Sequence, residues 1–274
     1  MDVTQTFLSV LYTIQTKMSV LRIKTIQMKK LLLFAALCTC FSCSYLPEKV
    51  ELSTAVSIEE TPDYISLIPA NNAPLSTGII FYPGGLVDPH AYIETFEELV
   101  STDGRQVVIM KVAANLAITN SGKAHRFIDD FEAVSDWVIG GHSLGGVVAC
   151  MDAEAHPDAY KGLFLLAAYS ISNLSDWDAP VMLLTGELDV VGNPGDLVEN
   201  EPNLPPRLDV LTLAEIPTNG TSGQTIYHEI SGANHAQFGN YGAQAGDSPA
   251  AISAEAQQSE VRDFLRTFFN VNSL

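Results

Sequence analysis

From residue 63 onward, short apolar runs alternate with longer amphipathic segments, and this alternation constrains the fold more than any other feature. The runs have the length of strands and are nearly continuously apolar, which is typical of strands covered on both faces. Six such runs are GIIFY (78–82), QVVIMKV (106–112), DWVIGG (136–141), KGLFLLA (161–167), PVMLLTG (180–186) and TIYHEIS (225–231). Helices are expected over 90–102, 122–134, 144–156 and 253–269. The order predicts an α/β fold with a mostly parallel central sheet and helices on both faces.

Two further segments do not follow this alternation. The run DYISLIP (63–69) has the pattern of an additional strand, and we expect it to be antiparallel at the edge of the sheet. The region 191–224 is rich in proline and has few apolar clusters, so we expect mostly loop with a short helix.

The first 43 residues differ in composition from the rest of the chain. The segment MKKLLLFAALCTCFSC begins at Met28 with two lysines nearby, continues with an apolar stretch and ends at Cys43. This layout is typical of a bacterial export signal, and the apolar stretch is shorter than the roughly 20 residues that span a membrane. The ending resembles the lipobox of bacterial lipoproteins, although Cys40 stands where that motif prefers leucine.

We therefore expect residues 1–43 to be an export signal that starts at Met28, residues 44–62 to be a polar tether and residues 63–274 to be the folded domain. Cys43 is the expected lipidation site; cleavage without lipidation and an uncleaved anchor are the alternatives. The protein would then be exported and lipid-anchored to a bacterial membrane, facing the periplasm or the cell exterior.

The charge and the cysteine content exclude several classes of protein. With 32 acidic and 14 basic residues the net charge is −18, which repels phosphate backbones and argues against nucleic-acid binding. Cys150 is the one cysteine outside the signal, so no internal disulfide forms, and we expect it to be a buried apolar residue. The histidines show no paired spacing typical of metal ligands, so we expect neither a metal nor another cofactor.

The stretch VIGGHSLGGVVAC (138–150) contains a serine between glycines where a predicted strand ends and a predicted helix begins. Gly141, Ser143 and Gly145 form the pattern G-x-S-x-G, in which the serine lies at a sharp strand-to-helix turn. Side chains two residues before and after the serine would collide there, so glycines occupy those positions. Ser143 is therefore the candidate nucleophile.

A serine hydroxyl needs a base, and the base needs an acid that orients it. Asp189 in LLTGELDVVG follows one predicted strand, and His235 in ISGANHAQFG follows the last. Glu187 and Asp247 are the alternative acids. His142, beside the serine, is expected to pack or to line the pocket.

An acyl transfer also needs donors for the developing oxyanion. One expected donor is the backbone N–H of Leu144, the residue after the nucleophile. The loop in FYPGGLVDPHAY, after the strand 78–82, contains Gly84 and Gly85 and can turn its amides inward. Gly85 or Leu86 is the expected second donor.

On these residues the chain resembles the α/β-hydrolase superfamily over about residues 63 to 271. The loop PGGLVDPHAY and the run NHAQFGNYGAQAGD are similar to small bacterial hydrolases grouped near dienelactone hydrolases. The resemblance implies a serine hydrolase with Ser143 as nucleophile, His235 as base and Asp189 as the orienting acid. One departure is Pro83, where many esterases have histidine before the loop glycines.

Few residues separate the helix 144–156 from the strand 180–186, and a strand must fit among them, so no sizeable lid is expected. The pocket would then be shallow and open. Its expected walls are the aromatic side chains Tyr82, Tyr92, His142, Phe238 and Tyr241.

The sequence predicts an enzyme that cleaves carboxylic esters of small molecules through an acyl-enzyme. Two alternatives stay open: an acyltransferase or thioesterase on the same triad, and a non-catalytic surface binding protein on a hydrolase fold. The identity of the substrate and the oligomeric state stay open too.

Overall fold

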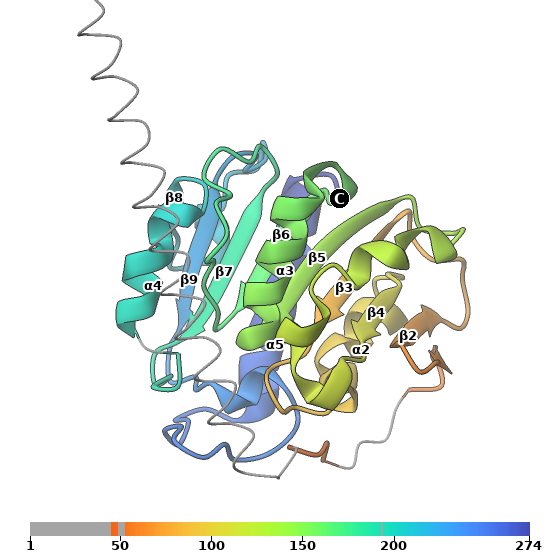
Figure 1. Ribbon diagram of the computed structural model, residues 1–274, viewed down its shortest axis with the longest axis horizontal. Helices are drawn as coiled ribbons and strands as arrows, with labels where there is room; N and C mark the ends of the chain where they lie inside the picture. The colour runs from red at the N-terminus through yellow and green to blue at the C-terminus, as the bar shows by residue number, and fades with distance from the viewer. Residues whose placement is uncertain (1–44, 49–52, 193) are drawn as a thin grey trace, which may run out of the picture. The chain divides into compact units, whose positions relative to one another are not determined.

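The computed structural model describes residues 45–48, 53–192 and 194–274, and Figure 1 shows their arrangement. The predicted signal, including Cys43, lies outside the described residues. In the part of the chain that is described, no helix combines the length and the apolar character needed to cross a membrane.

A nine-stranded sheet forms the centre of the molecule, in the order β1-β2-β4-β3-β5-β6-β7-β9-β8. The strands are β1 (Val56–Glu60), β2 (Tyr64–Pro69), β3 (Thr77–Tyr82), β4 (Val107–Met110), β5 (Asp136–His142), β6 (Gly162–Leu166), β7 (Val181–Gly186), β8 (Arg207–Asp209) and β9 (Thr225–Ile230). β1 and β2 run antiparallel to their neighbours, and all other neighbouring strands are parallel. The predicted parallel sheet is confirmed, and each of the six apolar runs forms a strand.

The antiparallel end of the sheet is larger than the sequence indicated. The run 63–69 forms the antiparallel strand β2 as expected, but β2 is not at the edge, because β1 pairs along its outer side. β1 lies within residues 44–62, the segment that was expected to be a tether. Most side chains of β1 are exposed, so it has no apolar run, and only its backbone pairing reveals it as a strand.

Two other segments also depart from the expectation. Residues 122–134 form two short 3₁₀ turns, Ala124–Arg126 and Ile128–Asp130, in place of the predicted helix. Phe127 and Phe131 pack edge-on against Tyr64 of β2, and these contacts hold the turns. The region 191–224 contains the expected short helix and also the edge strand β8.

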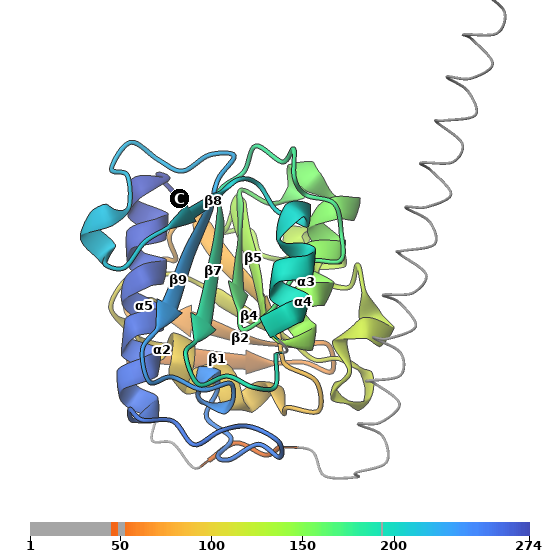
Figure 2. The same ribbon diagram turned by 90° about the vertical axis from the view of Figure 1, so that its left-hand side faces the viewer.

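Helices cover both faces of the sheet, as Figure 2 shows. α2 (Ile93–Ser101) and α5 (Ala254–Val271) lie on one face, and α3 (Leu144–Ala155) and α4 (Pro194–Asn200) lie on the other. Each face has its own apolar core, and Cys150 of α3 is fully buried in one of them, as predicted. Burial raises the pKa of its thiol to about 12.

The connection between β6 and β7 contains no helix, so this connection forms no sizeable lid. The strands β3, β5 and β7 are parallel, so their carboxyl ends meet at one edge of the sheet. In open α/β sheets this edge is the usual place for a functional site.

Candidate active site

Ser143 lies in a sharp turn between β5 and α3. Its backbone has φ 52° and ψ −123°, a strained conformation for a residue with a side chain. Ser143 N–H donates to the Leu166 carbonyl of β6 at 2.9 Å, and the Ser143 carbonyl accepts from Gly146 N–H at 3.0 Å. The turn is thereby fixed on both sides, and Ser143 stays partly exposed at the start of the helix.

The glycines around Ser143 have no space for a side chain. A Cβ on Gly141 would lie 2.4 Å from the backbone of Gly145, and a Cβ on Gly145 would lie 2.2 Å from the Tyr82 carbonyl oxygen. The strand, the turn and the helix therefore pack backbone against backbone. This is the geometry that the G-x-S-x-G pattern predicts.

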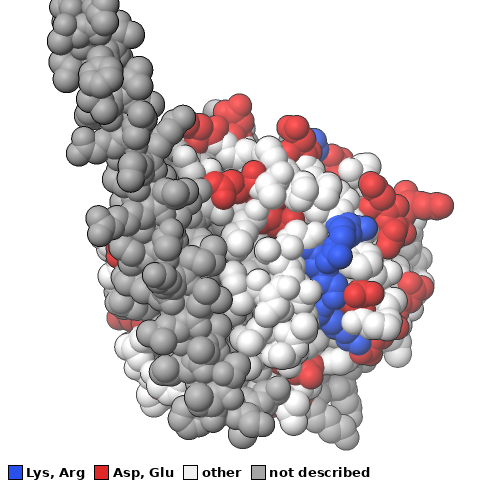
Figure 3. Space-filling view, viewed as in Figure 1, with Lys and Arg blue, Asp and Glu red and all other residues white. Residues whose placement is uncertain are grey.

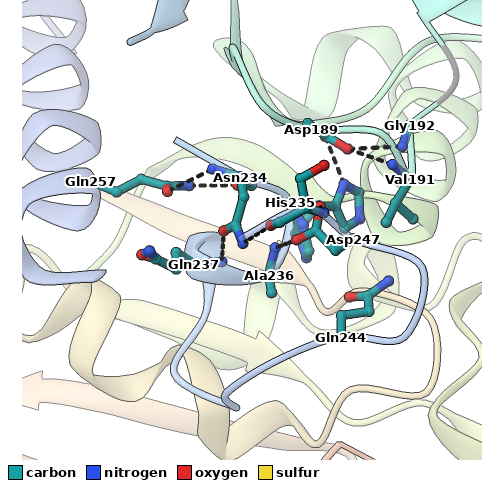
Figure 4. Close-up of polar contacts among 12 residues, drawn as sticks. Asp189, Val191, Gly192, Asn234, His235, Ala236, Gln237, Gln244, Asp247 and Gln257 are labelled. Atoms are coloured by element: carbon teal, nitrogen blue, oxygen red, sulfur yellow. Dashed lines mark hydrogen bonds and ion pairs between the residues drawn. The ribbon is translucent and has the colours of Figure 1, made fainter. Parts of the chain in front are cut away.

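His235 and Asp189 form a buried pair. His235 Nδ1 lies 2.7 Å from Asp189 Oδ2, and the two side chains are 1% and 7% exposed (Figure 4). A carboxylate only accepts, so Nδ1 carries the proton and Nε2 has a free lone pair. Nε2 is buried and has no hydrogen-bond partner among the described residues. In the neutral imidazole, Nε2 is therefore an acceptor without a partner.

The second oxygen of Asp189 holds the carboxylate in place. Oδ1 accepts from Val191 N–H at 2.9 Å and from Gly192 N–H at 3.0 Å, so the loop after β7 wraps around the carboxylate (Figure 4). The alternative acids have other contacts. Glu187 accepts from Ser231 and Gly232, and Asp247 accepts from Ala236 and Ser248. The acid that contacts His235 is therefore Asp189.

The loop that carries His235 is held by side chains that the sequence did not reveal. Gln257 of α5 accepts from Asn234 N–H at 3.2 Å and donates to the Asn234 carbonyl at 2.8 Å. Asp247 accepts from Ala236 N–H at 2.9 Å. The residues before and after His235 are thus both anchored, as Figure 4 shows. No motif marks Gln257, because its role depends on the packing of α5 against this loop.

The loop after β3 brings one free amide to the nucleophile turn. Leu86 N–H donates to the Asn115 carbonyl at 2.6 Å, so the prediction of Leu86 as a donor to an oxyanion is wrong. Gly84 N–H donates to the Tyr92 hydroxyl at 2.9 Å. Neither Gly85 N–H nor Leu144 N–H has an acceptor within the described part of the chain. A Cβ on Gly85 would lie 3.3 Å from Leu144 Cδ2, so these two amides belong to adjacent segments.

The aromatic side chains predicted to wall an open pocket lie in the core instead. Tyr82, Tyr92, His142 and Phe238 have no exposed surface, and Tyr241 is 5% exposed. Their polar atoms are used inside the protein: Tyr82 donates to Asp152 at 2.8 Å, and Tyr92 Oη lies 2.8 Å from His142 Nδ1. The expectation failed because the apolar bodies of these rings fill the space behind the site.

A cavity of about 280 Å³ lies between α4 and the strands β7 and β9. Asp189, Gly192, Tyr169, Leu197 and Tyr227 are among the residues that line it. Neither Ser143 nor His235 lines this cavity. It is therefore separate from the place where a substrate carbonyl would meet Ser143.

Acidic residues outnumber basic ones in the chain, 32 to 14. On the face shown in Figure 3, acidic side chains lie in several places and most of the basic ones gather in one band. Two of the lysines in the described part of the chain are paired, Lys123 with Asp63 at 2.9 Å and Lys111 with Glu60. This charge distribution disfavours strongly anionic ligands.

The fold is similar to that of several solved esterases. A thermostable esterase from Pseudomonas putida ECU1011 has a TM-score of 0.55 and 15% identity, with 81% of this chain and 85% of that chain covered. Est1E from Butyrivibrio proteoclasticus has a TM-score of 0.53 and 13% identity, with 79% and 99% covered. An esterase from Pyrobaculum calidifontis has a TM-score of 0.53 and 13% identity, with 81% and 86% covered. At these identities the similarity establishes the fold alone.

Among curated protein sequences, none matches the chain significantly. A model of the alpha/beta hydrolase family matches residues 78–259, which is more than half of the chain. The matched span runs from β3 into α5 and includes Ser143, Asp189 and His235. The chain belongs to the alpha/beta hydrolase family.

Proposed function

We propose that this protein is a serine hydrolase that cleaves carboxylic esters of small molecules through an acyl-enzyme on Ser143. The observation that carries the proposal is the buried His235–Asp189 pair, whose free Nε2 lone pair has no partner in the described part of the chain. A buried acceptor without a partner is costly in a purely structural role. It suits a base that waits for the proton of a hydroxyl group.

The first half of the reaction follows from these groups. Ser143 Oγ attacks the ester carbonyl carbon, and His235 Nε2 takes the hydroxyl proton. The carbonyl oxygen becomes an oxyanion that the N–H groups of Leu144 and Gly85 stabilise. The C–O bond to the alcohol then breaks, and the imidazolium of His235 gives its proton to the departing oxygen. The acyl group stays on Ser143.

The second half repeats these steps with water. His235 Nε2 takes a proton from water while the water oxygen attacks the acyl carbon, and the proton then returns to Ser143 Oγ as the acid leaves. Throughout, Asp189 keeps the Nδ1 proton of His235 in place and stabilises the positive charge on the ring. The excess of acidic over basic residues and the absence of a helix between β6 and β7 support small esters without a strong negative charge.

The nucleophile is tested with a fluorophosphonate probe and p-nitrophenyl esters of increasing chain length. The Ser143→Ala variant should lose labelling and about 10⁵- to 10⁶-fold in kcat, and the exposed Ser121→Ala variant should keep both. If folded wild-type protein takes no label and cleaves no ester, the chain is a binding protein and the proposal fails. Parallel assays with thioesters and with added alcohols identify a thioesterase or an acyltransferase.

The acid is tested separately. Asp189→Asn should lower kcat by about 10⁴-fold, because the amide no longer holds His235 in the tautomer with Nε2 free. Glu187→Gln is the matched control and should keep its activity, because Glu187 contacts Ser231 and Gly232 and not His235. Equal losses in the two variants would refute the assignment of Asp189.

We also propose that the protein is exported and lipid-anchored through Cys43. The support is the segment MKKLLLFAALCTCFSC, with its basic start, apolar middle and cysteine ending. Bacteria that express the full chain would be fed an alkyne-labelled fatty acid. The protein should carry the label and sediment with membranes, Cys43→Ser should lose both properties, and Cys40→Ser should keep them. An unlabelled wild-type protein would refute lipidation.

A further inference from the structure

We propose that Tyr92 and His142 act together as positioning residues that hold the loop after β3, so that the Gly85 N–H is the single amide of this loop that reaches the oxyanion. The inference rests on the proposed serine-hydrolase function. It adds two buried side chains that make no contact with substrate.

One direction of the hydrogen bonds in this pair satisfies the Tyr92 hydroxyl proton. Gly84 N–H donates to the Tyr92 oxygen at 2.9 Å, which uses that oxygen as an acceptor. The Tyr92 hydroxyl proton is then directed to His142 Nδ1, 2.8 Å away. With Nδ1 as the acceptor of that proton, the neutral His142 ring carries its own proton on Nε2.

Burial keeps both side chains neutral. Tyr92 and His142 have no exposed surface. Desolvation, followed by the proximity of His235, holds the pKa of His142 well below its usual value, and desolvation raises the pKa of the Tyr92 phenol. Neither group changes its charge near neutral pH, so the hydrogen bonds from Gly84 N–H through Tyr92 to His142 do not depend on pH in that range.

These hydrogen bonds determine which backbone amide of the loop is available to bind the oxyanion. Gly84 lies directly against the pair, since a Cβ there would be 2.8 Å from His142 Nδ1 and 2.9 Å from Tyr92 Oη. On the other side, Leu86 N–H is bound by the Asn115 carbonyl. With both neighbours held, Gly85 N–H is left between them, next to Leu144.

The same pair also contacts the base. The rings of His142 and His235 have their centroids 4.6 Å apart. His235 becomes positively charged when it takes the proton of Ser143, and a charged neighbour at this distance would oppose that step. A neutral His142 does not. Tyr92 and His142 thus link the oxyanion loop and the base through one buried contact.

The test is Tyr92→Phe, which keeps the ring and removes the hydroxyl. Gly84 N–H and His142 Nδ1 then lose their partner, and the loop keeps its anchor at Leu86 but loses the one at Gly84. We expect kcat to fall about 10- to 100-fold with KM within twofold, because the loss is limited to the transition state. The affinity for a trifluoromethyl ketone, which mimics the tetrahedral intermediate, should fall by the same factor as kcat/KM.

Two controls separate positioning from folding. Tyr241→Phe removes the hydroxyl of another buried tyrosine near His142, one that donates to Gln244, and should keep kcat within twofold. His142→Leu should reproduce the loss seen in Tyr92→Phe, and the double variant should lose no more than either single one. Urea unfolding shows which variants are folded at the assay temperature.

The outcomes are distinct. If wild-type protein is active and Ser143→Ala is not, but folded Tyr92→Phe keeps its kcat and its ketone affinity, the positioning role is wrong and the hydrolase function stands. A loss confined to the unfolding midpoint, with normal kcat, refutes it in the same way. If wild-type protein lacks activity and takes no fluorophosphonate, the hydrolase function fails and this inference fails with it.

Discussion

Two glycine-containing turns follow parallel strands and form the candidate site, and they are held by different forces. The turn at Ser143 follows β5 and packs backbone against backbone, with the Tyr82 carbonyl 2.2 Å from where a Cβ on Gly145 would lie. The loop at Gly85 follows β3 and is held by hydrogen bonds from distant residues, Tyr92 and Asn115. The first turn is determined by local sterics and the second by tertiary contacts.

The loop of His235 belongs with the second type. Gln257 and Asp247 bind the backbone on the two sides of His235. Gln257 belongs to α5, and Asp247 lies 12 residues after the histidine in the sequence. A turn that is fixed by close backbone packing tolerates no residue larger than glycine at the contact, but it needs no hydrogen bond from a distant side chain. A turn held by side chains tolerates small changes in its own sequence but depends on residues elsewhere in the chain.

The largest expected difference between the two turns comes from adding one methyl group to each. Gly145→Ala places a Cβ against backbone oxygens at 2.2 and 2.3 Å, and we expect it to lower the free energy of unfolding by about 3 kcal/mol or more. Gly85→Ala places its Cβ 3.3 Å from the movable Leu144 side chain, so the cost should stay below about 1 kcal/mol. Urea unfolding measures both. Similar costs would show that the two turns are not held differently.

The histidine loop gives a second test. Gln257→Leu removes both partners of the Asn234 backbone, and leaving buried polar groups unpaired should lower the free energy of unfolding by about 2 kcal/mol. The neighbouring Gln258→Leu removes one bond, to the Gln237 carbonyl at 3.2 Å, and should cost about half as much. If urea titrations give equal losses of unfolding free energy for the two variants, the contacts of Gln257 with Asn234 do not stabilise this loop more than an ordinary hydrogen bond does.

The buried His142 predicts a dependence of stability on pH. The pKa of His142 in the folded protein lies well below 6.5, mainly because of desolvation. Below pH 6.5 the unfolded chain therefore binds a proton that the folded chain does not, and stability falls as the pH falls, by up to about 1.4 kcal/mol per pH unit.

His142→Gln removes the titrating group and keeps an acceptor for Tyr92. We expect the slope of unfolding free energy against pH, measured between pH 6.5 and 5, to be smaller in this variant by up to the same amount. Identical slopes would show that His142 is not held neutral in the folded protein.

The smallest expected effect on stability lies in the segment 113–115, whose Asn115 carbonyl accepts from Leu86 N–H. Ala114 has φ 54°, which strains a residue with a side chain, so Ala114→Gly should stabilise the fold by about 0.5 kcal/mol. Ala113→Gly, at an exposed neighbour without positive φ, should destabilise it by about 0.5–1 kcal/mol. The Asn115 carbonyl remains in both variants, so the proposed esterase activity should not change. Thermal unfolding shows whether each variant is stabilised or destabilised. A change in the same direction in both variants would show that the backbone at Ala114 is not strained.

Much of the fold could be predicted because its signals are local. Six apolar runs became strands, since a strand buried on both faces needs a continuous apolar stretch. Strand β1 was missed because its side chains are mostly exposed. The helix expected over 122–134 was wrong, because contacts of Phe127 and Phe131 with Tyr64 outweigh a weak helical pattern.

By itself, the sequence determined the parallel sheet, the turn at Ser143 and the position of Asp189 and His235 after strands that end at one edge. These depend on backbone sterics and on the period of apolar residues, which neighbouring positions encode. Only the tertiary structure decided that Asp189 and not Glu187 contacts His235, that Gly85 and not Leu86 keeps a free amide, and that Tyr92 and His142 lie behind the site. Those choices depend on hydrogen bonds between residues far apart in the chain, which exist only after the sheet has brought its strand ends together.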